Sequence, residues 1–125
     1  MEAPRTVSRV AIGICAAAAL FHAYQAMQGE GIEIAFPLFA WSIVPYMVPV
    51  VLAITGVRHA IAIVSAACAF AFDLYIFAAV HMSHSSTAAI TFLWAPVWNA
   101  TIVVPVAAGG VWLWFKIRHG GQRAS

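Results

Sequence analysis

The chain contains very few charged residues. Lysine, arginine, aspartate and glutamate together make up 8% of its 125 residues, whereas soluble domains carry roughly 25%. Hydrophobic residues make up 64%, and a soluble domain of this length cannot bury so much apolar surface. Lipid must therefore solvate much of the chain. The sequence predicts one all-α integral membrane domain spanning residues 1–125, with the lipid bilayer as its first partner.

Several chemical motifs are also missing. The two cysteines, Cys15 and Cys68, lie in separate apolar runs without a Cys-x-x-Cys spacing, which argues against a disulfide framework. The sequence has no nucleophile motif, phosphate-binding loop, zinc-protease motif or paired carboxylates, so it predicts a non-enzymatic protein. No basic stripe is interleaved with aromatic residues, which excludes nucleic acid as an expected partner.

Four long apolar segments are present instead. Helices are expected at about 10–27, 35–55, 60–80 and 88–117. Each segment has about the length needed to cross a ~30 Å hydrocarbon layer. Their short connections predict antiparallel neighbours in an up-down-up-down bundle. The first segment looks like a signal peptide, but the residues at its end form a poor cleavage site, so a retained helix is expected.

The basic residues predict the orientation of the bundle. All six lysines and arginines fall on one side of the expected four-helix topology, and the two opposite loops have none. Cytoplasmic loops are enriched in lysine and arginine, so both termini are expected in the cytoplasm, in a plasma membrane of the bacterial inner-membrane type. The six residues are Arg5, Arg9, Arg58, Lys116, Arg118 and Arg123.

Two further patterns bear on how the helices pack. Gly13 with Ala17, and Ser65 with Ala69, have the small-xxx-small spacing that lets helices approach closely. Pro45 and Pro49 lie inside the second segment, where each removes a backbone donor. They indicate either a kinked helix that lines a cavity or the ordinary abundance of proline in membrane helices.

Asp73 is the strongest candidate for a functional residue, since it is the only acidic residue in any of the four segments. Burying a charge in a membrane is costly, so a lone carboxylate there marks a functional site by default. The other segments each carry a polar residue at broadly similar depth: His22, Tyr46 and Asn99. We therefore expect these side chains to converge on Asp73 as a buried polar cluster inside the bundle.

A second candidate site lies at the outer end of the third segment. His81 and His84 have the His-x-x-His spacing that can supply two metal ligands from adjacent helical turns. A competent site needs three or four ligands, so an interfacial polar loop is the simpler interpretation. A haem held by His22 with His81 or His84 is a weaker alternative, because the depths of these residues differ. No cofactor is therefore expected.

Three functions remain open at this point. The first is an accessory or assembly subunit built around the polar cluster at Asp73, which would contact other membrane subunits or a second copy of itself. The alternative is a small oligomeric transporter or channel coupled to a proton or cation through Asp73. The third is a periplasm-facing metal-binding protein that uses His81 and His84. The sequence alone favours the first.

Overall fold

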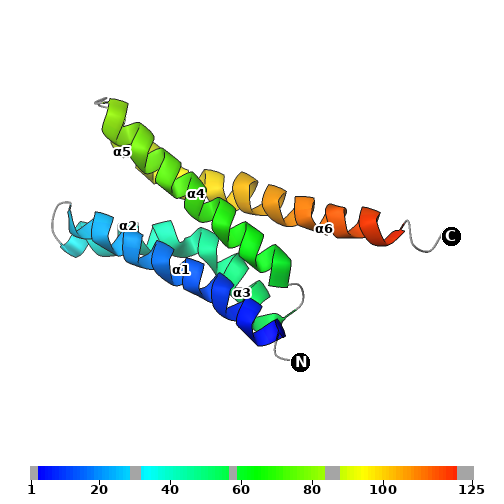
Figure 1. Cartoon of the computed structure of the whole chain (residues 1–125). Coiled ribbons are helices and arrows are strands. Elements are labelled where there is room, and N and C mark those ends of the chain that lie inside the picture. The colour runs from blue at the N-terminus through cyan, green and yellow to red at the C-terminus, as the bar shows by residue number, and fades with distance from the viewer. Residues whose placement is uncertain (1–2, 29–31, 57–58, 84–87, 121–125) are drawn as a thin grey trace.

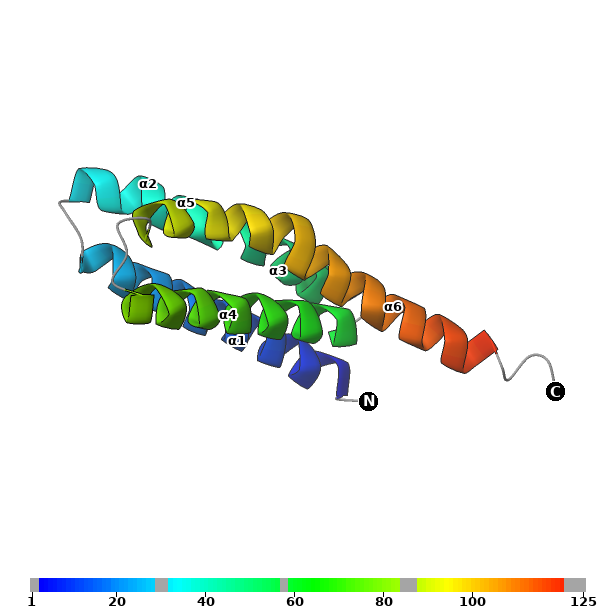
Figure 2. The same ribbon diagram turned by 90° about the horizontal axis from the view of Figure 1, so that it is seen from above.

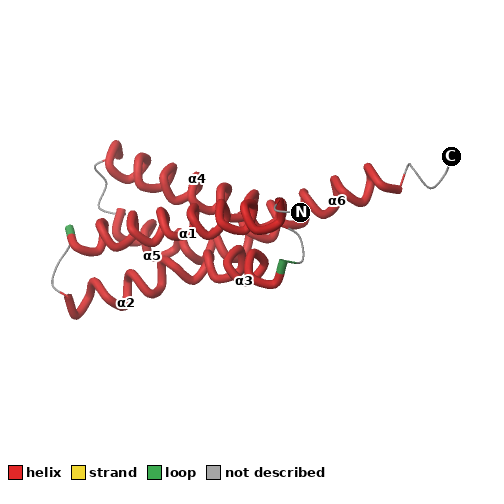
Figure 3. Tube along the Cα trace, turned by 60° about the horizontal axis from the view of Figure 1, so that its bottom comes forward, coloured by secondary structure: helices red, strands yellow, loops and turns green. Residues whose placement is uncertain are grey.

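The computed structural model describes residues 3–28, 32–56, 59–83 and 88–120, and the regular structure in these ranges is helical (Figure 3). Four of its helical stretches are long and apolar enough to cross a membrane: Arg9–Met27, Phe36–Thr55, His59–Ser83 and Ile90–Gly120. The number of expected spans is thus matched by the structure. All four belong to one compact arrangement, with the third span at its centre.

Two of the spans are continuous and two are interrupted. Helices α1 (Ala3–Met27) and α4 (His59–Ser83) have 25 residues each. The second span consists of α2 (Ile32–Ile43), the 3-10 turn η1 (Val44–Tyr46) and α3 (Met47–Thr55). The fourth span consists of α5 (Ala88–Trp98), the π-helical turn η2 (Asn99–Val103) and α6 (Val104–Gly120). The expected ranges 35–55 and 88–117 each cover one of these spans, but each span contains a short turn of a different helical type.

Prolines account for both interruptions. Pro49 cannot donate to the carbonyl of Pro45 one turn earlier, and the backbone tightens there so that the Met47 N–H donates to the Val44 oxygen. Pro105 cannot donate to the carbonyl of Thr101, and the helix widens just before it, with the Val104 N–H donating to the Asn99 oxygen. The boundaries of the other two helices differ from the expected 10–27 and 60–80 only by extra turns at their ends.

Helix α4 lies at the centre of the packing and contacts α1, α3 and α6. Small side chains permit this close approach. The fully buried face of α4 consists of Ala62, Ser65, Ala66 and Ala69. Transmembrane helices associate through such faces of small residues. The predicted pair Ser65 and Ala69 is part of this interface.

The predicted pair on α1 was wrong. Gly13 and Ala17 are exposed, and no atom lies within 4 Å of a Cβ built on Gly13. The buried face of α1 is instead Ala11, Cys15, Ala18 and His22. These residues recur every three or four positions, as one helical stripe does. Sequence spacing alone did not distinguish this stripe from the neighbouring one in a helix so rich in alanine.

The element ends gather in two groups. The start of α1, the end of α3 and the start of α4 lie at one end, while the end of α1, the start of α2, the end of α4 and α5 lie at the other (Figure 1). Helix α6 packs mainly on α4 and then extends past the other helices. Only 6% of the fourth span's most apolar window is buried, against 33% for the span formed by α4. The fourth span is therefore the least buried of the four.

Candidate functional site

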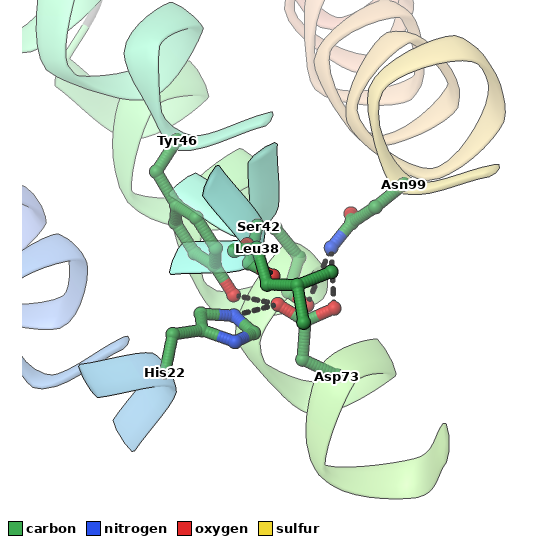
Figure 4. Close-up of polar contacts among 7 residues, drawn as sticks. His22, Leu38, Ser42, Tyr46, Asp73 and Asn99 are labelled. Carbon is green, nitrogen blue, oxygen red and sulfur yellow. Dashed lines mark hydrogen bonds and ion pairs between the residues drawn. The ribbon is translucent and has the colours of Figure 1, made fainter. Parts of the chain in front are cut away.

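The four polar residues expected to converge are brought together by the structure. His22 comes from α1, Tyr46 from η1, Asp73 from α4 and Asn99 from η2 (Figure 4). We call these residues the polar cluster. Each span contributes one side chain, and all four are buried, with Asn99 completely inaccessible and Asp73 6% exposed. The carboxylate of Asp73 is the common partner of the other three.

One carboxylate oxygen of Asp73 has two partners. The Tyr46 hydroxyl donates to Oδ2 at 2.5 Å, and His22 Nε2 lies 2.8 Å from the same oxygen. The 3-10 turn η1 places the Tyr46 side chain there, between two buried prolines of the second span. Hydrogen bonds to a charged acceptor are roughly twice as strong as neutral ones, so these contacts tie the first and second spans to the third.

The other oxygen of Asp73 is bonded by Asn99. Asn99 Nδ2 donates both to Asp73 Oδ1 and to the Ala69 carbonyl, each at 3.0 Å. Because both partners accept hydrogen bonds, the amide nitrogen must face them, and this fixes the orientation of the Asn99 side chain. Asn99 is the first residue of the π-helical turn η2. Such turns are frequent at functional sites, and this one presents the amide to α4.

The contact between His22 and Asp73 contains one proton. Both atoms are acceptors when unprotonated, so a 2.8 Å contact requires a proton on either His22 Nε2 or Asp73 Oδ2. An imidazolium facing a carboxylate and a neutral imidazole facing a carboxyl group both give the pair no net charge. A neutral imidazole with its proton on Nε2 makes the same contact to a carboxylate, and this arrangement has one proton fewer and leaves one negative charge buried, which is costly without a counter-charge. The pair can therefore store one proton.

A cavity of about 380 Å³ lies between α1, α2, α4 and α5. In Figure 2, α2 and α5 lie above α1 and α4. Residues of all four helices line the cavity. Asp73 and His22 line its inner part, together with Ser42. At its rim are Gln28 and His81, which are exposed. The cavity therefore connects the polar cluster with the end of the bundle where α1 and α4 finish.

The walls of this cavity are mostly apolar and aromatic. The apolar lining residues are Ala26, Leu38, Phe39, Ile76, Phe77, Phe92, Ala95 and Pro96. The wall formed by α2 and α5 is joined by a hydrogen bond from Trp41 Nε1 to the Leu93 carbonyl at 3.0 Å. Small-molecule sites have this composition, with apolar walls and a few placed polar groups. The cavity size of 380 Å³ also falls within the ~300–1,000 Å³ common for such sites.

On the other side of the polar cluster the helices are packed closely. Two clusters of buried side chains fill this part, which we call the alanine-packed half: Ala11, Ala53 and Ala62 in one, and Cys15, Ala18, Ala66 and Ala69 with Tyr46 and Val104 in the other. Most of these side chains are methyl groups. The polar cluster thus lies at the boundary between a closed half of the bundle and a half that contains the cavity.

The second candidate site lies only partly within the described residues. His81 is exposed, with its Nδ1 2.9 Å from the Phe77 carbonyl, and His84 lies outside the described residues. Within the described ranges, no three histidine, cysteine, aspartate or glutamate side chains come together as metal ligands. The two cysteines are free, Cys15 buried and Cys68 exposed. His22, the other residue considered for haem, is occupied by its contact with Asp73.

Sequence reasoning missed several parts of the site. The Ala69 carbonyl, which accepts from Asn99, leaves no signal in a sequence. Ser42 and the phenylalanines of the cavity wall are indistinguishable in sequence from lipid-facing residues, since they occur in uniformly apolar runs. Pro45 was the one available signal, because a proline inside a span indicates the irregular backbone that turns Tyr46 inward.

Comparison with known protein families, with curated proteins and with solved structures finds no match to this chain.

Proposed function

We propose that this chain is a non-enzymatic integral membrane protein that takes up and releases a proton or small cation at the His22–Asp73 pair, as a small transporter does. The observation that carries the proposal is the cavity that joins an intramembrane carboxylate to one end of the bundle. Ionisable residues at this depth mark ion and proton pathways by default. The sequence by itself favoured an accessory subunit, and the cavity moves the balance towards transport.

The direction of access follows from the charges. We propose that the chain crosses a plasma membrane of the bacterial type four times, with both termini in the cytoplasm. Arg9 lies in the first part of α1, Lys116 lines a pocket with His59 at the start of α4, and both are exposed, as is Arg118. Basic residues favour the cytoplasmic side. The cavity then opens on the periplasmic side, and the alanine-packed half faces the cytoplasm.

Proton flux into liposomes tests this proposal. The full chain is reconstituted in liposomes, and a pH gradient is followed with an entrapped dye while potassium and valinomycin balance the charge. We expect the wild type to dissipate the gradient and Asp73→Asn to lose this activity. His22→Gln should also lose it, whereas the matched variant His119→Gln, at the exposed end of α6, should retain it. Equal flux in all four proteins would contradict the proposal.

A second candidate is supported by a different observation. The fourth span is the least buried of the four, and exposed apolar side chains such as Trp112, Trp114 and Ile117 cover α6. An accessory subunit would use this surface to contact another membrane protein. Native mass spectrometry after mild detergent extraction separates these cases: a stoichiometric foreign subunit favours the accessory role, and a homo-oligomer or monomer favours transport.

A further inference from the structure

The chemistry of the cavity indicates what kind of solute it takes. We propose that it binds an organic cation, an ammonium or phosphonium centre carried on an apolar body, in exchange for the proton of the His22–Asp73 pair. This inference rests on the proposed function, because it names the solute that shares the site with the proton.

Charge is the first argument. Among the described residues, Asp73 is the only acidic side chain that lines the cavity, and no lysine or arginine lines it. The remaining polar lining consists of amides, hydroxyls and the two histidines His22 and His81. An anionic solute would therefore meet a carboxylate and no permanent positive charge, while a cation would meet its counter-charge at the inner end of the cavity.

Hydrogen-bonding capacity is the second argument. A carboxylate offers about four acceptor positions, and the polar cluster uses three of them: Tyr46 and His22 on Oδ2, and Asn99 on Oδ1. One position on Oδ1 is left for a donor from a solute. A cation without donors is attracted to the same oxygen by charge alone.

The aromatic walls are the third argument. Phe39, Phe77 and Phe92 line the cavity, with Tyr24 nearer its rim. Aromatic faces attract organic cations, by about 0.5–2 kcal/mol for each favourable contact. They also bury the apolar body of such a solute. A small hydrated metal ion would gain nothing from these walls, which is why we infer an organic cation.

Exchange with the proton follows from the groups that face Asp73. Two titratable groups contact Asp73 directly, His22 on α1 and Tyr46 on η1. Two more lie further away: Cys15, which packs beside Tyr46, and His81, which lines the cavity on α4. The elements η2 and α2 contribute only neutral groups, the Asn99 amide and the Ser42 hydroxyl. A solute cation beside a protonated His22–Asp73 pair leaves the site with a net positive charge in a low-dielectric region. Binding the cation therefore releases one proton from the pair into the cavity.

The test uses two ions of the same shape and opposite charge. The full chain in nanodiscs of zwitterionic lipid is titrated with tetraphenylphosphonium and with tetraphenylborate, and bound ion is measured by equilibrium dialysis against empty nanodiscs. We expect saturable binding of the phosphonium alone, weakened at least about tenfold in Asp73→Asn. Raising the pH should tighten binding, with release of about one proton per ion bound in weakly buffered solution. His22→Gln should keep binding, because Asp73 still supplies the negative charge.

The outcomes separate this inference from the proposed function. Equal binding of the two ions to the wild type, a comparison that needs no variant to fold, would overturn the inference. So would phosphonium binding that is unchanged in a folded Asp73→Asn protein. If neither ion binds but proton flux into liposomes still depends on Asp73, only the organic cation is wrong. If that flux is also absent, the proposed function itself is wrong.

Discussion

The two halves of the bundle are held together in different ways. In the alanine-packed half, methyl groups bring α1, α3 and α4 into direct contact. In the other half, α1, α2, α4 and α5 surround a cavity. At its inner end, hydrogen bonds from Tyr46 and Asn99 join the second and fourth spans to Asp73 of α4. Lipid provides no hydrophobic force between helices, so packing and hydrogen bonding are the two available means of association. This chain uses one on each side of Asp73.

The comparison predicts that added volume is tolerated in one half only. Ala66 is fully buried in the alanine-packed half. Ala66→Leu forces α1 and α4 apart and should lower the free energy of unfolding by about 3 kcal/mol, the upper end of the range for overpacking. Ala67, the next residue, is exposed, so Ala67→Leu is the matched control and should have little effect. Unfolding by sodium dodecyl sulfate in mixed micelles, followed by circular dichroism, measures both; equal values would refute close packing here.

The second prediction concerns the hydrogen bonds by which Asn99 in η2 joins the fourth span to α4. Asn99→Leu keeps the side-chain volume but removes the donor to Asp73 Oδ1 and Ala69. We expect a loss of about 2 kcal/mol, because a buried carboxylate oxygen is left without its partner. Thr101→Val is the control in the same turn, since the Thr101 hydroxyl is exposed and donates only within its own helix, to the Val97 carbonyl. A loss as large in the control would mean that the turn, and not the Asn99 amide, sets the stability.

The third prediction concerns the second span. Tyr46→Phe deletes one hydroxyl and its 2.5 Å bond to Asp73. Hydrogen bonds between membrane helices are worth about 0.6 kcal/mol on average and up to about 1.7; the charged acceptor places this one near the top, at about 1.5 kcal/mol. Thermal unfolding in dodecyl maltoside should show the decrease. Combining Tyr46→Phe with Asp73→Asn in a double-mutant cycle should give less than the sum of the two losses, and strict additivity would rule out a direct interaction.

The smallest effect is expected in the cavity. Ser42 lines it and donates only to the Leu38 carbonyl of its own helix. Ser42→Leu adds volume into open space, so the free energy of unfolding should change by no more than about 0.5 kcal/mol. Phosphonium binding should nevertheless weaken, because the added side chain occupies the solute's place. A stability loss like that of Ala66→Leu would show that this space is filled by packed side chains after all.

The sequence predicted more of the site than of the backbone that builds it. Composition and length identified four apolar spans, and one polar residue per span identified His22, Tyr46, Asp73 and Asn99. Neither indicated that two of the spans change helical type. The π-helical turn at Asn99–Val103 shifts the phase of the helix, so residues before and after it do not share one periodicity of 3.6. A pattern read over the whole fourth span therefore averages two different faces.

The small residues failed as a guide for a related reason. Several pairs of small residues lie four apart on α1, so the pair Gly13 and Ala17 was as plausible as the buried pair Ala11 and Cys15. The buried stripe is selected by His22, which must reach Asp73 and so fixes the rotation of α1. The contact of His22 with Asp73 therefore determines which side of α1 faces the bundle, and the small alanine side chains on that side allow close packing.

The position of Asp73 between an open and a closed half also determines how strongly the membrane potential acts on a charge bound there. An electric field falls mainly across the part of a membrane that excludes water. In the orientation proposed above, the cavity brings the periplasmic solution close to Asp73, and most of the potential drops across the alanine-packed half. A charge arriving from the periplasm then crosses little of the field, while one leaving towards the cytoplasm crosses most of it, at about 2.3 kcal/mol per charge for 100 mV. Binding would be almost insensitive to voltage, and passage through the alanine-packed half would be the step that voltage drives.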